Sequence, residues 1–409
     1  MRMNTLVRKL IGVTSLFVEG VRLEEGLVVR VRPRWLGPRC GGCGRRAPRY
    51  DRGRRRRWHH LGLGRTRIQL EYAPCRVHCS RCGVRVEKVP WAGHRSGFTH
   101  AFEEMTAYLA QVTDQTTVKS IMGIAWETVG AIVQRIVDRR LDPTRVEGLQ
   151  RIGIDEFSYR RRHRYLTVVV DHDRRRVVWA APGRSAQTLR GLFEELGRER
   201  CAKIRSVTID MSGGYLQAIR EFLPNGEVVF DRFHVQRLAS DAVDAVRREQ
   251  LRDLRGTDEG KALFRSRFVL WKNPWNLTRW ERQKLHDIER MNQRLYRAYL
   301  LKETLAQCLD YKQPARGEAA LRQWLGWASR SKLKPFVRIA RTIRRHLEGI
   351  LAYVRQRLTN GIVEGFNTRL RMIARRAYGF HTPQPLIAML YLCCGGIELD
   401  PPLPAPTKG

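Results

Sequence analysis

The fold of this chain is decided by residues 151–181, which read RIGIDEFSYRRRHRYLTVVVDHDRRRVVWAA. Three runs rich in β-branched residues follow one another closely here and predict three antiparallel strands. Residues 185–231 then alternate between helix and strand, in the segments SAQTLRGLFEEL, KIRSVTID, SGGYLQAIREF and EVVFD. The order βββαβαβ is that of a ribonuclease-H-like α/β domain, in which right-handed crossovers join the parallel strands.

Three acids stand out in this part of the chain. Asp155 lies in the first predicted strand, and Asp210 ends the fourth, which neighbours the first in this fold, so we expect the two aspartates to meet. Glu364 lies in the first turn of a final helix, NGIVEGFNTRLRMIARRAYG, that is expected to pack back on the sheet. Carboxylates from two strands and one helix suit two hard divalent ions, Mg²⁺ or Mn²⁺, which activate in-line phosphoryl transfer.

The charge of the chain points to a polyanionic partner. Lys and Arg number 77 against 40 Asp and Glu, which gives a formal net charge of +37 and a sequence pI near 11.0. Much of the excess is Arg, whose planar fork suits phosphate oxygens. No stretch is apolar over the roughly 18 residues that a membrane span needs, and the short apolar segment near the N-terminus lacks a signal-peptide cleavage site. Nucleic acid is therefore the expected partner.

Other polar residues near the acids are expected to have supporting or local roles. Asp231 ends the fifth strand shortly before His234, and this pair is expected to support the acids or to position DNA. Arg371 follows the glutamate by about two helical turns and so lies on the same face. Glu156 points to the face opposite Asp155, because strand residues alternate. Two further aspartates sit at a hairpin, where a turn role is expected: Asp171 and Asp173.

The nine cysteines are an odd number, and five of them fall between residues 40 and 82. This distribution argues against a secreted disulfide scaffold and fits a reducing cytosol. Two CxxC pairs, Cys40–Cys43 and Cys79–Cys82, predict one tetrahedral zinc ion that is structural, because four thiolates leave no open position. The long linker at 44–78 is expected to make a β-excursion. Four other side chains compete as ligands: Cys75, His59, His60 and His78.

The linker between the CxxC pairs also carries a candidate DNA contact. Its basic run stands beside Trp58 and comprises Arg54, Arg55, Arg56 and Arg57. In the loop of a zinc module such side chains can reach phosphates. The alternative is a charged tether.

Residues 100–140 are expected to be helical and to contain a helix-turn-helix. A short helix around 118–122, a turn at Gly123 and a second helix at 127–137 fit that pattern, although an ordinary helical hairpin is the alternative. An apolar stripe recurs at helical spacing: Val129, Ile132, Val133 and Ile136. Glu127, Gln134 and Arg135 then face outward, and the last two are candidates to read base edges in the major groove.

The remaining chain is organised around a helical insertion, in which residues 277–309 are expected to form one long helix. The Lys and Arg of the insertion either track DNA or form a solvated face. The N-terminal residues 1–35 alternate apolar and polar side chains and are expected to form short strands. We expect six segments: a β-rich zinc-binding module (1–95), a helix-turn-helix domain (96–147), the first part of the catalytic domain (148–234), an all-α insertion (235–357), the last part of the catalytic domain (358–400) and a disordered tail (401–409).

The chain resembles DDE insertion-sequence transposases of the ISL3 family. The resemblance is carried by IDEFSYRRRHRYLTVVVD, IDMSGGYLQAIREFLPN, FDRFHV and NGIVEGFNTRLRMIARRAYGF, after the paired CxxC motifs and the helix-turn-helix, and it covers about residues 25–395. The long, Arg-rich linker between the CxxC pairs departs from the family pattern. The resemblance implies three sets of residues: the catalytic triad Asp155, Asp210 and Glu364, the aspartate-x-x-histidine element Asp231–His234, and the basic residue Arg371.

The sequence therefore predicts a cytoplasmic, nucleoid-associated transposase with no membrane partner. It is expected to bind the terminal inverted repeats of its own element and target DNA, and to assemble on DNA as a dimer or larger homo-oligomer. Strand cleavage and strand transfer are expected to use two Mg²⁺ or Mn²⁺ ions per active site. One alternative is a catalytically inactive or domesticated DNA-binding regulator derived from a transposase. Another is a structure-specific nuclease that cleaves DNA without joining it.

Overall fold

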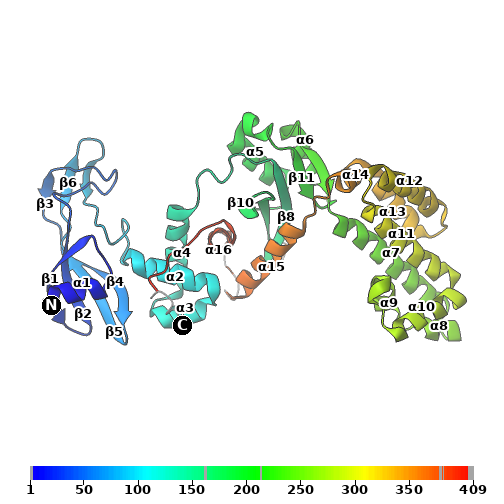
Figure 1. Ribbon diagram of the computed structural model, residues 1–409, viewed down its shortest axis with the longest axis horizontal. Coiled ribbons are helices and arrows are strands. Elements are labelled where there is room, and N and C mark those ends of the chain that lie inside the picture. Colours follow the sequence, from blue (N-terminus) through cyan, green and yellow to red (C-terminus); the bar gives the residue numbers. More distant parts are fainter. Residues whose placement is uncertain (1–2, 161–163, 212–213, 377–379, 381, 404–409) are drawn as a thin grey trace. The chain divides into compact units, whose positions relative to one another are not determined.

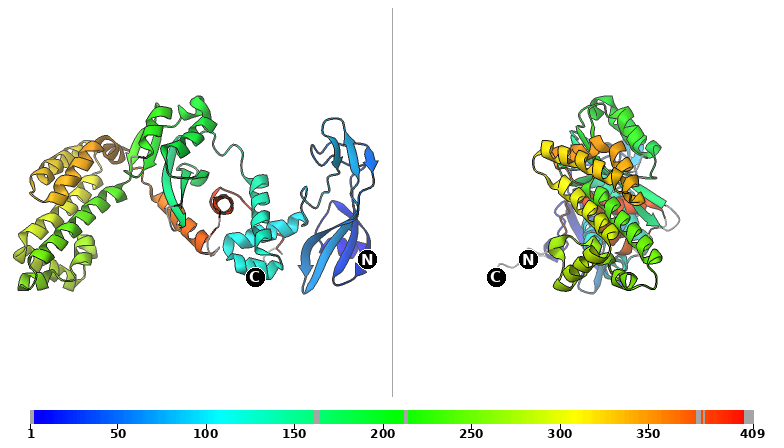
Figure 2. Two further views of the ribbon diagram at one scale, coloured as in Figure 1. Left: turned by 180° about the vertical axis from the view of Figure 1, so that it is seen from behind. Right: turned by 90° about the vertical axis from the view of Figure 1, so that its right-hand side faces the viewer.

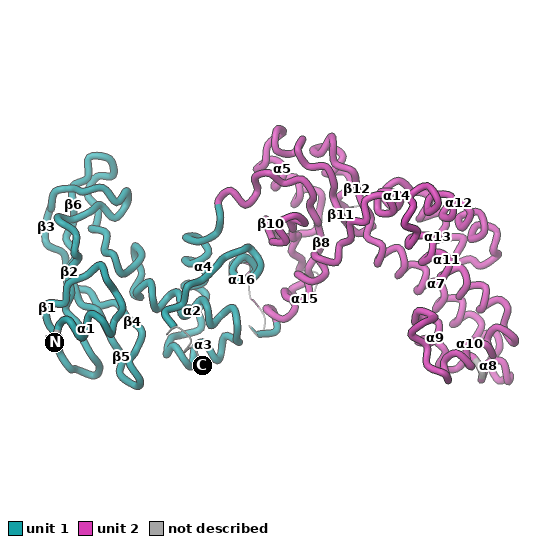
Figure 3. The backbone as a smooth tube through the Cα atoms, viewed as in Figure 1, with its two compact units in different colours: residues 1–142, 375–378, 384–409 teal, residues 143–374, 379–383 magenta. Residues whose placement is uncertain are grey.

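The computed structural model describes residues 3–160, 164–211, 214–376, 380 and 382–403. The chain divides into two compact units, one of residues 1–142, 375–378 and 384–409 and one of residues 143–374 and 379–383 (Figure 3). From residue 404 onward the tail expected at 401–409 lies outside the described part. No helix in the described part has the length and apolar character needed to cross a membrane.

The first unit begins with a helix that the sequence analysis missed. Residues expected to be strands form α1 (Met3–Leu10) before β1 (Leu16–Leu23) and β2 (Leu27–Pro33). Val7 and Ile11 lie four residues apart and are both buried, so their spacing is that of a helix face packed on the sheet. The prediction of strands alone for residues 1–35 was therefore wrong at its N-terminal end.

The linker between the CxxC pairs contributes to two sheets. Its hairpin β4 (Arg56–Leu63) and β5 (Thr66–Tyr72) joins the N-terminal hairpin in a sheet of order β1-β2-β5-β4, with β2 and β5 parallel. The small sheet β3-β6-β7 is made by β3 (Arg49–Asp51), β6 (Arg76–Cys79) and β7 (Gly83–Val86). The linker is long because it supplies half of the larger sheet, whose core includes Trp58 and Leu70.

Three helices form the helix-turn-helix: α2 (His100–Val112), α3 (Gln115–Met122) and α4 (Trp126–Arg140) (Figure 1). Asp114 caps α3 by accepting the N–H of Thr117, and Gly123 ends α3 with φ of 62°, a left-handed conformation that favours glycine. The apolar stripe expected on α4 is buried: Val129, Ile132, Val133 and Ile136. The turn and the stripe agree with the sequence prediction.

The last helix, α16 (Pro383–Cys394), is apolar along nearly all of its length. The structure groups residues 384–409 with the first unit, whereas we expected residues 358–400 to complete the catalytic domain. Gln111 at the end of α2 donates its side-chain N–H to the carbonyl of Leu392 at 2.6 Å. Leu386, Leu390 and Leu392 of α16 are buried, as expected for a helix that is apolar nearly all round.

The second unit is built on a five-stranded sheet of order β10-β9-β8-β11-β12. Its strands are β8 (Arg151–Arg160), β9 (Arg164–Asp171), β10 (Arg176–Pro182), β11 (Ser206–Ile209) and β12 (Glu227–Phe230). The first three are antiparallel, and β8, β11 and β12 are parallel. This is the ribonuclease-H-like order predicted from the sequence.

The two faces of this sheet are covered differently. Ile152 and Ile154 share a hydrophobic core with Leu189 and Phe193 of α5 (Ala186–Cys201), and α6 (Leu216–Phe222) contributes to the same core. The other face of β8 carries Gly153, and α15 (Gly361–Arg376) lies alongside it (Figures 1 and 2). Asp155 shares the face of Gly153, because strand residues alternate.

Eight helices and one short 3-10 turn lie between β12 and α15. Asn292 divides the segment expected to be a single helix, because its side chain accepts the N–H of Leu295 at 2.8 Å and so starts a new helix. The expectation of one continuous helix over 277–309 was wrong for this reason. The elements are α7 (Arg232–Asp253), α8 (Asp258–Leu263), α9 (Arg267–Trp271), η1 (Pro274–Asn276), α10 (Arg279–Met291), α11 (Gln293–Asp310), α12 (Pro314–Arg330), α13 (Lys334–Arg345) and α14 (Leu347–Gln356).

Candidate active site

The register of the central strands sets Asp155 opposite Asp210. Thr208 of β11 pairs with Gly153 of β8 in parallel register, so the residues two positions further on each strand lie across from one another. Burial is the largest cause that raises the pKa of Asp155, and the charge of Asp210 raises it further. The two aspartates are therefore close enough to interact electrostatically.

Asn367 of α15 reaches the first of these acids. Its Nδ2 donates to Asp155 Oδ2 at 2.6 Å, while Asp155 Oδ1 accepts the backbone N–H of Glu156 at 2.7 Å. Asn367 is buried, and its Oδ1 has no hydrogen-bond partner among the described residues. The sequence analysis missed Asn367. Its spacing of three residues from Glu364, which places both on one helix face, was the available signal.

A buried chain of hydrogen bonds fixes the start of α15 against the sheet. Thr208 Oγ1 donates to Asn360 Oδ1 at 2.7 Å and lies 2.7 Å from His172 Nε2. Since the single hydroxyl proton goes to Asn360, His172 must donate from Nε2. The carbonyl of Asn360 in turn accepts the backbone N–H of Glu364 at 2.8 Å. The network thus ties the helix of the third acid to the strand that leads to the second.

Gly153 permits this close approach. A Cβ atom at this position would lie 2.5 Å from Val363 Cγ2, 2.8 Å from His172 Nε2 and 3.0 Å from Thr208 Oγ1. Distances below about 3 Å leave no room for a methyl group between the strand and α15. Val363 immediately precedes Glu364, so the glycine sets how near the third acid comes to the sheet.

Glu364 itself is exposed in the first turn of α15. Among the described residues, one group of three or more metal-binding side chains has its ligand atoms within 4.8 Å of one another, and this group contains cysteines only. Asp155 and Asp210 thus lie at one edge of the sheet and Glu364 lies on the helix that packs there, but the three acids do not form so tight a cluster. Arg371 is also exposed on α15.

The supporting residues occupy the same edge. Asp231 is buried and caps α7, where its side chain accepts the N–H of Phe233. The charge of His234 lowers the pKa of Asp155, against the larger effect of burial. Burial, followed by the charge of Asp210, raises the pKa of Glu156, so this residue also lies near the acids.

Asp171 accepts the N–H groups of the residues that follow it in the hairpin, which is the turn role expected.

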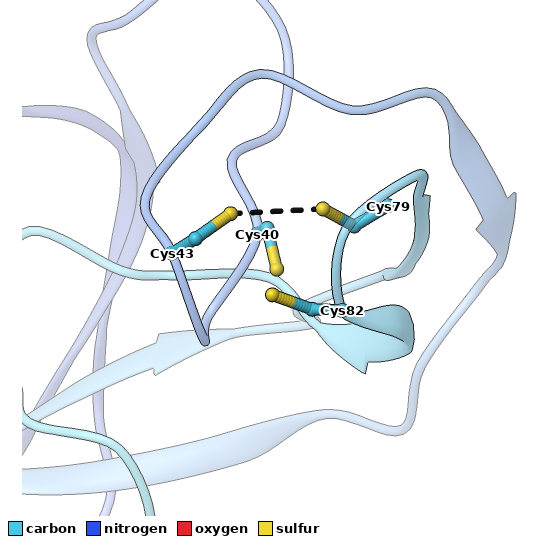
Figure 4. A group of neighbouring side chains, drawn as sticks. All are labelled: Cys40, Cys43, Cys79 and Cys82. Carbon is cyan, nitrogen blue, oxygen red and sulfur yellow. Dashed lines mark hydrogen bonds between the residues drawn. The ribbon is translucent and has the colours of Figure 1, made fainter.

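Four cysteines converge in the first unit as the spacing predicted. The Sγ atoms of Cys40, Cys43, Cys79 and Cys82 all lie within 4.8 Å of one another (Figure 4). The N–H groups of Arg81 and Cys82 lower the pKa of the Cys79 thiol to about 7. Such a cluster is compatible with zinc, which binds thiolates.

The competing ligands are used elsewhere or lie outside the cysteine cluster. His60 is buried, with Nδ1 2.8 Å from Thr99 Oγ1 and Nε2 3.0 Å from the carbonyl of Ile11. His59 packs against the ring of Phe98. Cys75 and His78 are not members of the four-cysteine group.

One candidate DNA contact on α4 differs from the sequence expectation. Arg135 does not face outward freely, because its Nε donates to the buried carboxylate of Glu103 on α2 at 2.7 Å. Gln134 and Glu127 are exposed as expected. The difference arises because α2 presents an acid to this side of α4, which the sequence of α4 does not reveal.

The second half of the basic run beside Trp58, Arg56 and Arg57, belongs to a strand rather than to a loop. Arg57 pairs with Glu71 at 3.2 Å and with Glu24 at 2.9 Å, and Arg55 lies 3.9 Å from Glu71. Arg56 donates to the carbonyl of Ser96. Arg54 is exposed just before β4. Three of the four arginines are thus tied to the sheet β1-β2-β5-β4 or to its neighbours, although all four remain exposed.

A ribonuclease-H-like sheet with paired acids at its edge, in one chain with a helix-turn-helix, defines a DNA-processing class of enzyme. Residues 152–390 match a family model described as transposase, and residues 87–137 match the helix-turn-helix domain of transposase family ISL3. The chain is 40% identical over 431 residues to the transposase for insertion sequence element IS1557 of Mycobacterium tuberculosis, in strains CDC 1551 / Oshkosh and ATCC 25618 / H37Rv, covering 97% of this chain and 96% of the relative. It is 32% identical over 347 residues to the transposase for insertion sequence element IS1001 of Bordetella parapertussis, covering 83% and 85%. The chain belongs to the ISL3 family of transposases.

Proposed function

We propose that this transposase binds the terminal inverted repeats of its element and catalyses DNA strand cleavage and strand transfer at Asp155, Asp210 and Glu364. The observation that carries the proposal is the 2.6 Å hydrogen bond from Asn367 to Asp155. Asn367 lies on the helix that bears Glu364, and the strand of Asp155 pairs with the strand that leads to Asp210. This contact supports a single site built by β8, β11 and α15.

The donor set of this site fits divalent cations. Asp155 is half-buried beside a second carboxylate, an arrangement that raises its pKa and that a cation would stabilise in the ionised form. Carboxylate oxygens are the ligands that Mg²⁺ and Mn²⁺ prefer. We propose that Asp155, Asp210 and Glu364 hold two such ions, which would activate the attacking oxygen and stabilise charge on the leaving oxygen.

The residues around the acids have defined tasks in this proposal. Asn367 and the N–H of Glu156 each donate to one oxygen of Asp155, so they orient its carboxylate. His234 and Asp231 support the same edge. Arg371, exposed about two turns after Glu364 on the same helix face, is placed to contact a phosphate of the substrate.

DNA recognition is assigned to the first unit. The exposed Gln134 of α4 is the candidate to contact base edges, since glutamine pairs well with adenine. The exposed arginines of the basic run, Arg54, Arg55, Arg56 and Arg57, would contribute contacts to phosphates. Zinc at the four cysteines would hold the module together without taking part in chemistry. We further propose that the transposase acts on DNA in the cytoplasm. There it would assemble on the paired ends of its element as a dimer or larger homo-oligomer.

The test uses labelled duplexes that carry the imperfect inverted repeats flanking the reading frame. The wild-type protein is expected to prefer these ends over random duplex, to cut them with Mg²⁺ or Mn²⁺ but not Ca²⁺, and to join the cut end to a second duplex. Binding without cutting would instead indicate a DNA-binding regulator. Cutting without joining would indicate a structure-specific nuclease.

A further inference from the structure

The outer face of α13 carries an unusual concentration of positive charge. The helix has the sequence KPFVRIARTIRR and contains no acidic residue. Lys334, Arg338, Arg341 and Arg345 are all exposed. Their spacing of four, three and four residues keeps them within about 60° of arc at 100° per residue, so they form one ridge along the helix. We call these four residues the α13 ridge.

The opposite face of α13 is buried in the helical insertion. Phe336, Ala340 and Ile343 have no exposed surface, and Ile339 is 7% exposed. Because the apolar face already packs within the protein, α13 cannot insert that face into a lipid surface. The ridge therefore presents charge alone to its surroundings.

The cations of the α13 ridge have no acidic partner among the residues that the structure describes. Several other exposed cations of the insertion are, by contrast, paired with acids. Arg322 lies 2.7 Å from Glu318, and Lys261 lies 2.8 Å from Asp258. Arg294 lies 2.9 Å from Glu249, and Arg237 lies 4.0 Å from Asp241. The sequence alone could not distinguish paired from unpaired cations here. Exposed cations without an ion pair also occur elsewhere among the described residues of the insertion, at Arg279, Arg290 and Arg316 for example, but on α13 four of them line one face.

We propose that the α13 ridge binds the phosphate backbone of duplex DNA without reading its sequence. Unpaired arginines on one straight face match a row of phosphates, and the ridge spans about 16 Å at 1.5 Å per residue, close to the rise of five base pairs. The inference rests on the proposed function in that the duplex is the element end or the target. It adds to that function a second DNA-binding surface, in the helical insertion, separate from the helix-turn-helix.

The test compares two quadruple variants of the full-length protein with the same loss of charge. The first replaces the ridge, with Lys334→Gln, Arg338→Gln, Arg341→Gln and Arg345→Gln. The matched control replaces one Lys and three Arg that are already paired, with Lys261→Gln, Arg237→Gln, Arg294→Gln and Arg322→Gln. Circular dichroism and thermal unfolding confirm that both variants fold. Binding to a random duplex and to an inverted-repeat duplex is then measured by fluorescence anisotropy at several salt concentrations.

The ridge variant is expected to bind both duplexes roughly 10- to 100-fold more weakly, and the slope of log affinity against log salt is expected to fall by about 2–4. The control variant should change that slope by less than about 1. Equal losses in the two variants would show that only net charge matters and would overturn the proposal. An unchanged ridge variant would show a merely solvated face and would also overturn it.

Sequence preference separates this inference from the proposed function. The ratio of affinities for inverted-repeat and random duplex should be unchanged in the ridge variant, and a collapse of that ratio would contradict backbone-only binding. If the wild type shows no preference or no metal-dependent cutting, the proposed function fails. The comparison of ridge and control variants on random duplex still decides the role of the ridge in that case.

Discussion

Thr208→Val should destabilise the second unit far more than its change in size suggests. The valine methyl replaces the hydroxyl at nearly constant volume, but two buried groups lose their partner: the Nε2–H of His172 and the Oδ1 of Asn360, both 2.7 Å from the hydroxyl. Each buried group left unsatisfied costs about 1–3 kcal/mol, so the loss is about 2–6 kcal/mol. This is a large part of the roughly 5–15 kcal/mol that stabilises a typical domain.

The control for this prediction is Thr208→Ser, which keeps the hydroxyl and deletes a methyl group at a cost of about 1 kcal/mol. Guanidinium unfolding gives the free energies, and hydrogen exchange locates the change. Faster exchange is expected in β11 and at the N–H of Glu364, which is bonded to the carbonyl of Asn360. If valine costs no more than serine, the hydrogen-bonded network does not hold α15 on the sheet, and the reasoning is wrong.

Three further predictions concern other parts of the chain. The purified protein should contain about one zinc per chain by elemental analysis, and Cys40→Ser with Cys79→Ser should abolish it; zinc that persists in this variant would contradict the assignment. Burial lowers the pKa of His172 to about 4 from 6.5. The stability that neutral His172 contributes is therefore fully present above pH 6.5 and is lost as the pH falls toward 4, by up to roughly 3 kcal/mol. His172→Gln should flatten this part of the plot of unfolding free energy against pH. Arg135→Ala should destabilise the first unit by about 1–3 kcal/mol, because Glu103 is 1% exposed and loses a charged donor; Gln134→Ala should leave stability within about 0.5 kcal/mol and reduce preference for the inverted repeat instead.

Much of the architecture could be predicted because its signals are local. Runs of β-branched residues predicted the strands, and the topological rule for crossovers then placed the strand of Asp155 beside that of Asp210. The CxxC spacing identified the four cysteines that converge, since each pair of thiols is brought together by a short turn of its own backbone. Gly123 identified the turn of the helix-turn-helix, because a left-handed residue there favours glycine.

The features that escaped prediction depend on contacts between distant segments. Asn367 bonds to an acid more than two hundred residues away, so only the docking of α15 reveals its role. The prediction that Arg135 faces outward was wrong, because its side chain bonds to Glu103 on α2. The break at Asn292 was a local signal, since asparagine is a strong N-cap, but the surrounding helix formers concealed it.

The most direct test of the account is cleavage of a labelled element end in Mg²⁺ by variants of the three acids. Asp155→Asn, Asp210→Asn and Glu364→Gln should each abolish cleavage while leaving DNA binding intact, because each change removes a negative ligand from a cation site at nearly constant size. Glu348→Gln is the matched control, since Glu348 is also an exposed acid in the first turn of a helix, and it should cleave like the wild type. If Glu364→Gln cleaves as well as Glu348→Gln, the third acid has been assigned wrongly and the proposed site is contradicted.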